Sequence, residues 1–255
     1  MSSLYKGIKV TSIALALCAL LGPRLGFPAA ATVSSAEDIL ERSRAKYGAL
    51  KSYSDNGTVT TEYRGPGATG SSLVEHHTFT TYYRAPRQFF FEFRKNPKDS
   101  KERYVIWCPD GEDFQDWWSA TGNTSHHGRN PKVFALASYP TKGSVLQIPP
   151  LLFPKAEIQG PISGLRQYRL AGTEDVNGRP CYKLVGDLAL AYKTGAVTEA
   201  HPTTVWIDAE TLLVRKVFED TSTTGSLSTT MTTFDPQANP DLDDSRFHFT
   251  PSSAS

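Results

Sequence analysis

The feature that most constrains this fold is a long succession of short segments in which apolar and polar side chains alternate. Residues 58–64 show the pattern, because Val59, Thr61 and Tyr63 fall on one side of an extended chain with polar residues between them. Further segments that read as strands follow at residues 73–84, 86–94, 103–108, 113–120, 168–175, 181–188, 203–208, 213–220 and 226–234. A period of two residues is typical of strands that bury one face.

Turn residues separate these segments at short intervals. Pro109-Asp110-Gly111 favours a tight turn, and Asn177-Gly178 is the strongest short hairpin signal in the chain. Short connections join antiparallel neighbours, since parallel strands need a longer crossover. The sequence therefore predicts a mainly β (α+β) fold with about 9–11 antiparallel strands and two or three helices.

One helix is predicted before the strands. Ser34 or Ser35 can cap it, because an acidic residue follows three positions later at Glu37 or Asp38. Its apolar residues recur on one helical face, and these are Ala36, Ile39, Leu40, Tyr47 and Leu50. Residues 132–139 predict a second, short helix. Residues 121–130 are polar and contain glycine, so we expect a loop there.

A proline-rich apolar segment interrupts the strands at residues 145–154. Pro149, Pro150 and Pro154 exclude a central strand or a long helix, because proline lacks the backbone N–H that both need. We expect an ordered connection that covers apolar surface.

The first 31 residues have the three parts of a secretory signal peptide. Lys6 and Lys9 are basic, residues 10–21 are apolar, and residues 29–31 are small alanines. The apolar run is shorter than the roughly 20 residues that span a bilayer. The sequence predicts export and removal of residues 1–31, which leaves one domain at residues 32–255. An uncleaved single-pass anchor is the alternative.

Composition and motifs narrow the function. Hydrophobic residues make up 39% of the 255-residue chain and charged residues 21%, as in folded globular proteins. The net charge of +1 argues against nucleic-acid binding, which usually requires a basic excess. The chain contains neither the G-x-S-x-G motif of hydrolases nor a phosphate loop, a dinucleotide fingerprint or H-E-x-x-H. We therefore expect no catalytic site, cofactor or metal.

Two cysteines, Cys108 and Cys181, follow the predicted signal peptide. In an oxidising compartment they can form a disulfide, which would close a long loop and contribute roughly 4 kcal/mol of stability. Two separate buried thiols are the alternative, and the sequence leaves both open.

Aromatic side chains are concentrated in the first predicted strands. Phe89, Phe91 and Phe93 share one face of a strand, and tyrosines and tryptophans occupy the neighbouring strands. Such a sheet either fills its own interior or leaves an apolar cavity. A shift of one residue in register would reverse which face points inward.

The order of these elements resembles the superfamily of the periplasmic lipoprotein carrier LolA, which includes LolB and the sensor-binding protein RseB. The resemblance is carried by short segments in order, at residues 36–42, 50–53, 83–92, 107–111, 174–179, 205–208 with 212–216, and 239–247. It implies a half-open antiparallel β-barrel covered by helices, with an apolar concave face that holds acyl chains. Residues 145–153 would form part of the cover.

The resemblance also suggests which residues contact a ligand. The expected cavity lining is Tyr63, Tyr83, Phe89, Phe91, Phe93, Trp107, Trp118, Leu151 and Phe153. Arg87 and Arg94 are the candidates for a polar contact within the barrel.

The resulting hypothesis is an exported periplasmic carrier or binding protein for lipids or lipoprotein acyl chains. Its partners would be those chains and a membrane-bound donor or acceptor protein, and we expect a monomer. A protein-interaction or sensor module on the same scaffold, as in RseB, is the alternative. A secreted hydrolase is a third interpretation, which no nucleophile–base motif supports.

Overall fold

A single antiparallel sheet dominates the computed structural model, which describes residues 35–65, 72–156, 158–188, 200–223 and 227–251. Within these residues the sheet has 12 strands. They are β1 (Ser52–Arg64), β2 (Ser72–Arg84), β3 (Gln88–Asn96), β4 (Asp99–Cys108), β5 (Gln115–Trp118), β6 (Thr124–His126), β7 (Leu165–Val176), β8 (Arg179–Leu188), β9 (His201–Asp208), β10 (Val214–Asp220), β11 (Leu227–Phe234) and β12 (Gln237–Ala238).

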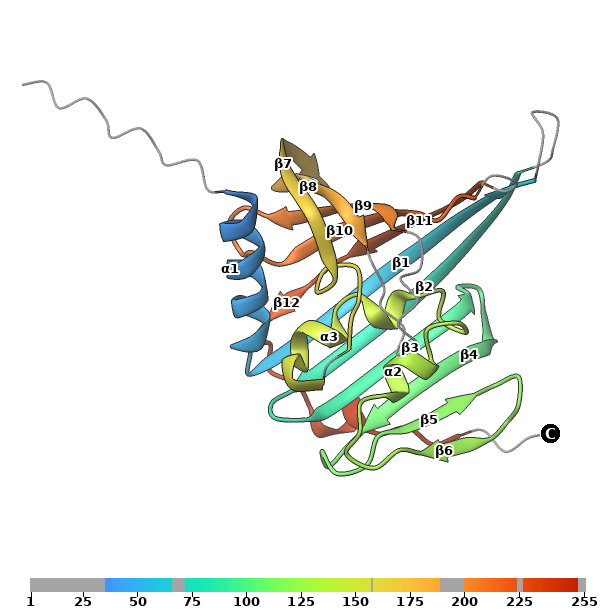
Figure 1. The fold of residues 1–255 in the computed structure, drawn as a ribbon. Coiled ribbons are helices and arrows are strands. Elements are labelled where there is room, and N and C mark those ends of the chain that lie inside the picture. Colours follow the sequence, from blue (N-terminus) through green and yellow to red (C-terminus); the bar gives the residue numbers. More distant parts are fainter. Residues whose placement is uncertain (1–34, 66–71, 157, 189–199, 224–226, 252–255) are drawn as a thin grey trace, which may run out of the picture. The chain divides into compact units, whose positions relative to one another are not determined.

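The strand order is β6-β5-β4-β3-β2-β1-β11-β10-β9-β8-β7, with β12 beside β1. Two meanders therefore meet at the β1–β11 pair, and the sheet stays open because β6 and β7 lie at its opposite ends (Figure 1). The mainly β, open antiparallel fold is confirmed. The predicted count of 9–11 strands was too low. The loop predicted at residues 121–130 contains β6, which pairs with β5 at Gln115–His126.

Six short helical elements accompany the sheet in the described residues. They are α1 (Ala36–Gly48), α2 (Val133–Leu136), α3 (Pro149–Leu152) and the 3₁₀ turns η1 (Ser144–Leu146), η2 (Pro154–Ala156) and η3 (Asp244–Phe247). None of the helices in this part of the chain has the length and apolar character needed to cross a membrane. The signal peptide predicted at residues 1–31 lies outside the described residues.

Helix α1 begins where the capping pattern predicted. The Ser35 hydroxyl accepts a hydrogen bond from the Asp38 backbone N–H at 3.0 Å. Ile39, Leu40 and Tyr47 are buried, so the predicted apolar face packs against the core.

Residues 131–156 form a cover segment over one face of the sheet. The segment contains α2, η1, α3 and η2, and Figure 1 shows α2 and α3 over the same face. Its own side chains Phe134, Val145 and Ile148 are almost completely buried. Helix α3 starts with Pro149-Pro150, where the missing N–H groups cost no helical hydrogen bond. The expected ordered apolar connection is confirmed.

Alternate residues of each strand define an inner face, beneath the cover segment, and an outer face. On β3 and β4 the pairs Phe89–Cys108, Phe91–Ile106 and Phe93–Tyr104 belong to the inner face. The neighbouring pair Phe90–Trp107 belongs to the outer face. Hydrophobic cores therefore form on both sides of the same strands.

The two cysteines are free and buried, so the disulfide alternative is wrong and the two-thiol alternative holds. Cys108 lies in the inner-face core on β4, whereas Cys181 packs beside Val176 and Trp206 in a separate cluster. Six strands separate β4 from β8, which corresponds to about 30 Å along a sheet. A disulfide requires Cα atoms within about 7 Å.

Candidate functional site

A cavity of about 550 Å³ opens where the β2–β3 turn meets the end of α1 and the end of the cover segment. Its apolar lining includes Leu50, Tyr83, Phe114, Leu152 and Phe153. Its basic lining consists of Lys51, Arg87, Arg129 and Lys155. We call this the aromatic-end cavity. Its volume lies within the range of ~300–1,000 Å³ that is usual for small-molecule sites.

Five aromatic rings pack together behind the mouth of this cavity. Phe153 is the central ring, with centroids 5.3 Å from Tyr83, 5.6 Å from Phe89, 5.6 Å from Phe114 and 5.5 Å from Phe134. Phe89 and Phe134 are fully buried, whereas Phe153 is partly exposed. The aromatic-end cavity therefore stops at Phe153, and the inner-face core begins directly behind that ring.

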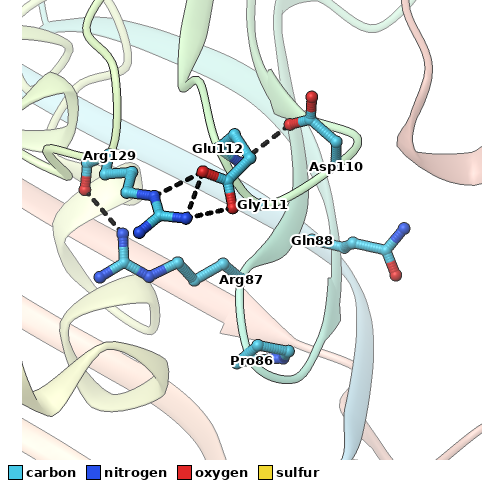
Figure 2. A pocket seen from close by; sticks show the side chains of 7 residues that line it. All are labelled: Pro86, Arg87, Gln88, Asp110, Gly111, Glu112 and Arg129. Atoms are coloured by element: carbon cyan, nitrogen blue, oxygen red, sulfur yellow. Dashed lines mark hydrogen bonds and ion pairs between the residues drawn. The ribbon is translucent and has the colours of Figure 1, made fainter.

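A smaller cavity of about 270 Å³ adjoins this mouth and shares Pro86, Arg87 and Arg129 with it. Figure 2 shows the arrangement of its side chains. The Arg129 Nε atom donates to Glu112 Oε2 at 2.6 Å, and a second guanidinium N–H also reaches this carboxylate. Hydrogen bonding to Arg129 holds the pKa of Glu112 below its usual value.

Arg87 contacts a backbone carbonyl instead of a carboxylate. Its Nη1 atom donates to the backbone carbonyl of Arg129 at 3.0 Å (Figure 2). Among the residues that the structure describes, no carboxylate forms an ion pair with Arg87. The positive charge is therefore available at the mouth of a mainly apolar cavity.

The predicted lining residues are divided between several places. Tyr83 and Phe153 line the aromatic-end cavity, together with the candidate polar residue Arg87. Phe93 and Trp118 line a second cavity at the other end of β3. Phe89, Phe91 and Leu151 are packed in the core, so the centre of the concave face is filled by the protein's own side chains. Tyr63 lies on β1, where its hydroxyl accepts from Lys142 Nζ at 3.1 Å.

Two predicted positions were wrong. Trp107 lies on the outer face, where its ring is 5.1 Å from Phe249. Arg94 also lies on the outer face and pairs with Glu92 at 2.9 Å. The Trp107 error arises because the sequence did not fix the register of β4. Arg94 follows Phe93 directly on β3, so it must point to the opposite face from Phe93 whatever the register.

Several lining residues were missed by sequence reasoning. Phe114 lies in the predicted strand segment 113–120, whereas Arg129 and Pro131 lie outside the predicted strands. Leu50 was recognised as part of the apolar helix face, but its place at a cavity depends on the packing of α1 beside the β2–β3 turn. Within the described ranges, histidine, cysteine and acidic side chains nowhere gather in the groups of three that could hold a metal ion.

Most of the chain matches the model of one known protein family. Residues 36–255 match the family described as "Predicted periplasmic protein (DUF2092)". The chain belongs to this family. No curated protein matches the sequence.

Solved structures to which the chain is similar include LprF from Mycobacterium bovis, at 12% identity and a TM-score of 0.44, covering 80% of this chain and 93% of that one. A LolA superfamily protein from Nitrosomonas europaea has 10% identity and a TM-score of 0.35, covering 85% and 98%. The Pseudomonas aeruginosa MucA/MucB complex has 16% identity and a TM-score of 0.37, covering 80% and 58%. The LolA superfamily named by the sequence resemblance is thus represented among these structures.

Proposed function

We propose that this member of the DUF2092 family is an exported periplasmic binding protein that holds the apolar chain of a lipid or of an acylated protein. The family description and the signal-peptide pattern of residues 1–31 support export to the periplasm. The binding event would be non-covalent, with no chemical change in the ligand.

The observation that carries this proposal is the aromatic-end cavity, which combines an apolar wall with a basic rim. Each methylene that leaves water contributes roughly 0.8 kcal/mol. A chain that buries about ten methylenes would therefore gain on the order of 8 kcal/mol before the costs of binding are subtracted. That gain is sufficient for useful affinity without a metal or a catalytic group.

Arg87 gives the ligand an orientation. Its guanidinium lies at the cavity mouth and lacks an ion-pair partner among the described residues. A carboxylate or phosphate head group would form a charge-assisted hydrogen bond there. Lys51 and Lys155 also line this cavity and add positive charge. The ligand class that fits is an amphiphile with an apolar chain and an anionic head.

Phe153 would control how deep the chain reaches. It is partly exposed, and it separates the cavity from the fully buried Phe89. Rotation of the Phe153 ring away from Phe89 would lengthen the cavity along the inner face. A longer acyl chain could then replace ring–ring contacts with chain–ring contacts.

The test is displacement of a fluorescent fatty acid, cis-parinaric acid, by palmitate. We expect micromolar binding by the wild type and about tenfold weaker binding by Arg87→Gln, which corresponds to about 1.4 kcal/mol. Arg94→Gln is the matched control, because Arg94 is an arginine of the neighbouring strand that lies on the outer face. Its affinity should equal that of the wild type.

Failure of the wild type to bind the probe at micromolar concentration would contradict the proposal. If that protein instead retained a membrane-protein partner with no acyl ligand present, the protein-interaction alternative would replace it. Equal losses in Arg87→Gln and Arg94→Gln would place the ligand away from the aromatic-end cavity.

A further inference from the structure

A second cavity, of about 650 Å³, lies at the opposite end of β3 from the aromatic-end cavity. Phe93, Tyr104 and Trp118 line it from β3, β4 and β5, and Tyr139 lines it from the cover segment. The two cavities share no lining residue. We call this second space the ion-pair cavity, for the charged residues described below.

Its aromatic wall is held in place by contacts outside the cavity. The Tyr104 hydroxyl donates to Asp116, whose other carboxylate oxygen lies 2.5 Å from His127 Nε2. The Phe93 ring lies 5.2 Å from the His77 ring. A ligand would therefore meet rings whose orientation is already set, which lowers the entropic cost of binding.

Two aromatic side chains of this cavity are open to solvent. Trp118 is 37% exposed, and its ring centroid is 6.4 Å from that of Tyr104. Tyr139 is 86% exposed. Trp107, Trp117 and Trp206 are each only 5% exposed. Trp118 and Tyr139 therefore offer exposed flat apolar surface on which a ligand can stack.

Acidic and basic side chains occur in pairs around the same space. Lys142 Nζ lies 3.0 Å from Glu75 Oε2 and donates to the Tyr63 hydroxyl at 3.1 Å. Lys95 Nζ lies 2.9 Å from Glu102 Oε2. Each pair offers strong donors and acceptors side by side, and in each pair the opposite charges compensate one another.

We propose that the ion-pair cavity binds a neutral saccharide. A sugar ring has an apolar C–H face that can stack on Trp118 and Tyr104, and a rim of hydroxyl groups that both donate to carboxylates and accept from ammonium groups. An acyl chain would remove water from the two ion pairs. It would offer no hydrogen bonds in place of those that the water made. The lining also includes the basic residues Lys101 and Arg103. The choice of a neutral ligand therefore rests on the two compensated pairs, Lys142–Glu75 and Lys95–Glu102. This inference concerns a separate site and does not rest on the proposed acyl-chain function.

The test is calorimetric and fluorescence titration of the whole protein with three neutral trisaccharides, namely maltotriose, cellotriose and chitotriose, up to about 10 mM. At least one should bind and change the tryptophan emission, because Trp118 is the exposed tryptophan of this cavity. Trp118→Ala should weaken binding about tenfold or more, and Trp118→Phe, which keeps a ring, should retain most of the calorimetric affinity.

Leu136→Ala is the control variant. Leu136 is 66% exposed on α2 and does not line the ion-pair cavity, so its replacement should leave saccharide affinity unchanged. Unaltered unfolding midpoints would confirm that each variant is folded. The inference is overturned if none of the three trisaccharides binds, or if Trp118→Ala binds as tightly as the wild type.

A parallel titration with cis-parinaric acid separates the two sites. If Trp118→Ala loses acyl binding and Arg87→Gln keeps it, the ion-pair cavity is an acyl site and the saccharide inference is wrong. If saccharide binds normally to Arg87→Gln while acyl binding weakens, both assignments are supported. Saccharide binding by a wild type that binds no fatty acid would support this inference while the proposed function fails.

Discussion

The inner and outer faces of strands β3 to β5 both carry aromatic side chains, yet they are covered in different ways. On the inner face, Phe89 packs under the cover segment, and cavities remain at both ends of β3. On the outer face, Trp107 and Trp117 pack against Phe249, and the guanidinium of Arg103 lies over the rings of Trp117 and Phe249. Strands with similar aromatic residues can therefore border cavities on one face and form a closed core on the other. The element that covers each face determines whether space for a ligand remains.

This comparison separates two roles for aromatic residues. The outer-face cluster closes a small core with side chains that lie close together. The inner-face cluster ends at Phe153, whose ring borders both buried core and open cavity. Aromatic content alone therefore does not identify a binding site. A site is indicated where packed aromatic side chains border an open cavity.

The largest expected effect distinguishes the two faces by stability. Phe89→Ala removes a fully buried ring that contacts Phe114, Phe134 and Phe153, and should lower the free energy of unfolding by about 3–5 kcal/mol. Phe90→Ala, on the outer face of the same strand, removes a partly exposed ring and should cost less than about 2 kcal/mol. Urea denaturation measures both. Equal losses would mean that the inner face is not the more tightly packed one.

A second prediction compares two carboxylates that are each 1% exposed. Asp55 lies on the inner face of β1, and burial raises its pKa to about 7. Asp208 lies at the end of β9. Burial alone would raise the pKa of Asp208, but hydrogen bonds from the Thr211 backbone and the Arg179 side chain lower it to about 2. The two groups should therefore respond to pH in opposite directions.

The sign of each effect follows from proton binding. Folded Asp55 holds its proton up to about pH 7 while the unfolded group loses it near pH 3.8, so stability falls as the pH rises between these values, by up to about 4 kcal/mol. Asp208 contributes stability above about pH 3.8, of roughly 2 kcal/mol, which is lost as the pH falls toward 2. Urea denaturation across this range should show that Asp55→Asn removes the first slope and Asp208→Asn the second. Identical pH profiles for Asp55→Asn and the wild type would refute the burial of Asp55.

The smallest effect concerns the two buried thiols. Burial raises the pKa of both Cys108 and Cys181 to about 11, so neither should react with Ellman's reagent in the folded protein at pH 8. Protein lacking residues 1–31 should show two reactive thiols in urea, and a reductant should change its stability by less than about 0.5 kcal/mol. A bonded pair would instead show no thiol in urea and lose about 4 kcal/mol on reduction.

Local signals in the sequence predicted much of the fold. Ser35 caps α1 as its spacing indicated, and Asn177-Gly178 forms the β7–β8 turn with positive φ angles of 54° and 78°. Pro149 and Pro150 occupy the first two positions of the short helix α3, and Pro154 follows its end. Each of these features depends on backbone chemistry within a few residues, which a single sequence carries.

The candidate sites were less predictable, because they depend on contacts between distant segments. Trp107 was placed on the wrong face, since strand register is set by the whole sheet. Arg129 and Phe114 approach Tyr83 only after the β5–β6 region folds back beside the β2–β3 turn. No local pattern in the sequence marks these two side chains as lining a cavity with Tyr83.

The most direct test of the central claim is a crystal structure of the protein soaked with a fatty acid brominated near the middle of its chain. The account predicts an anomalous bromine peak in the aromatic-end cavity beside Tyr83 and Phe153, with the carboxylate toward Arg87. A peak on the outer face beside Trp107, or an aromatic-end cavity that stays free of bromine at saturating ligand, would contradict it.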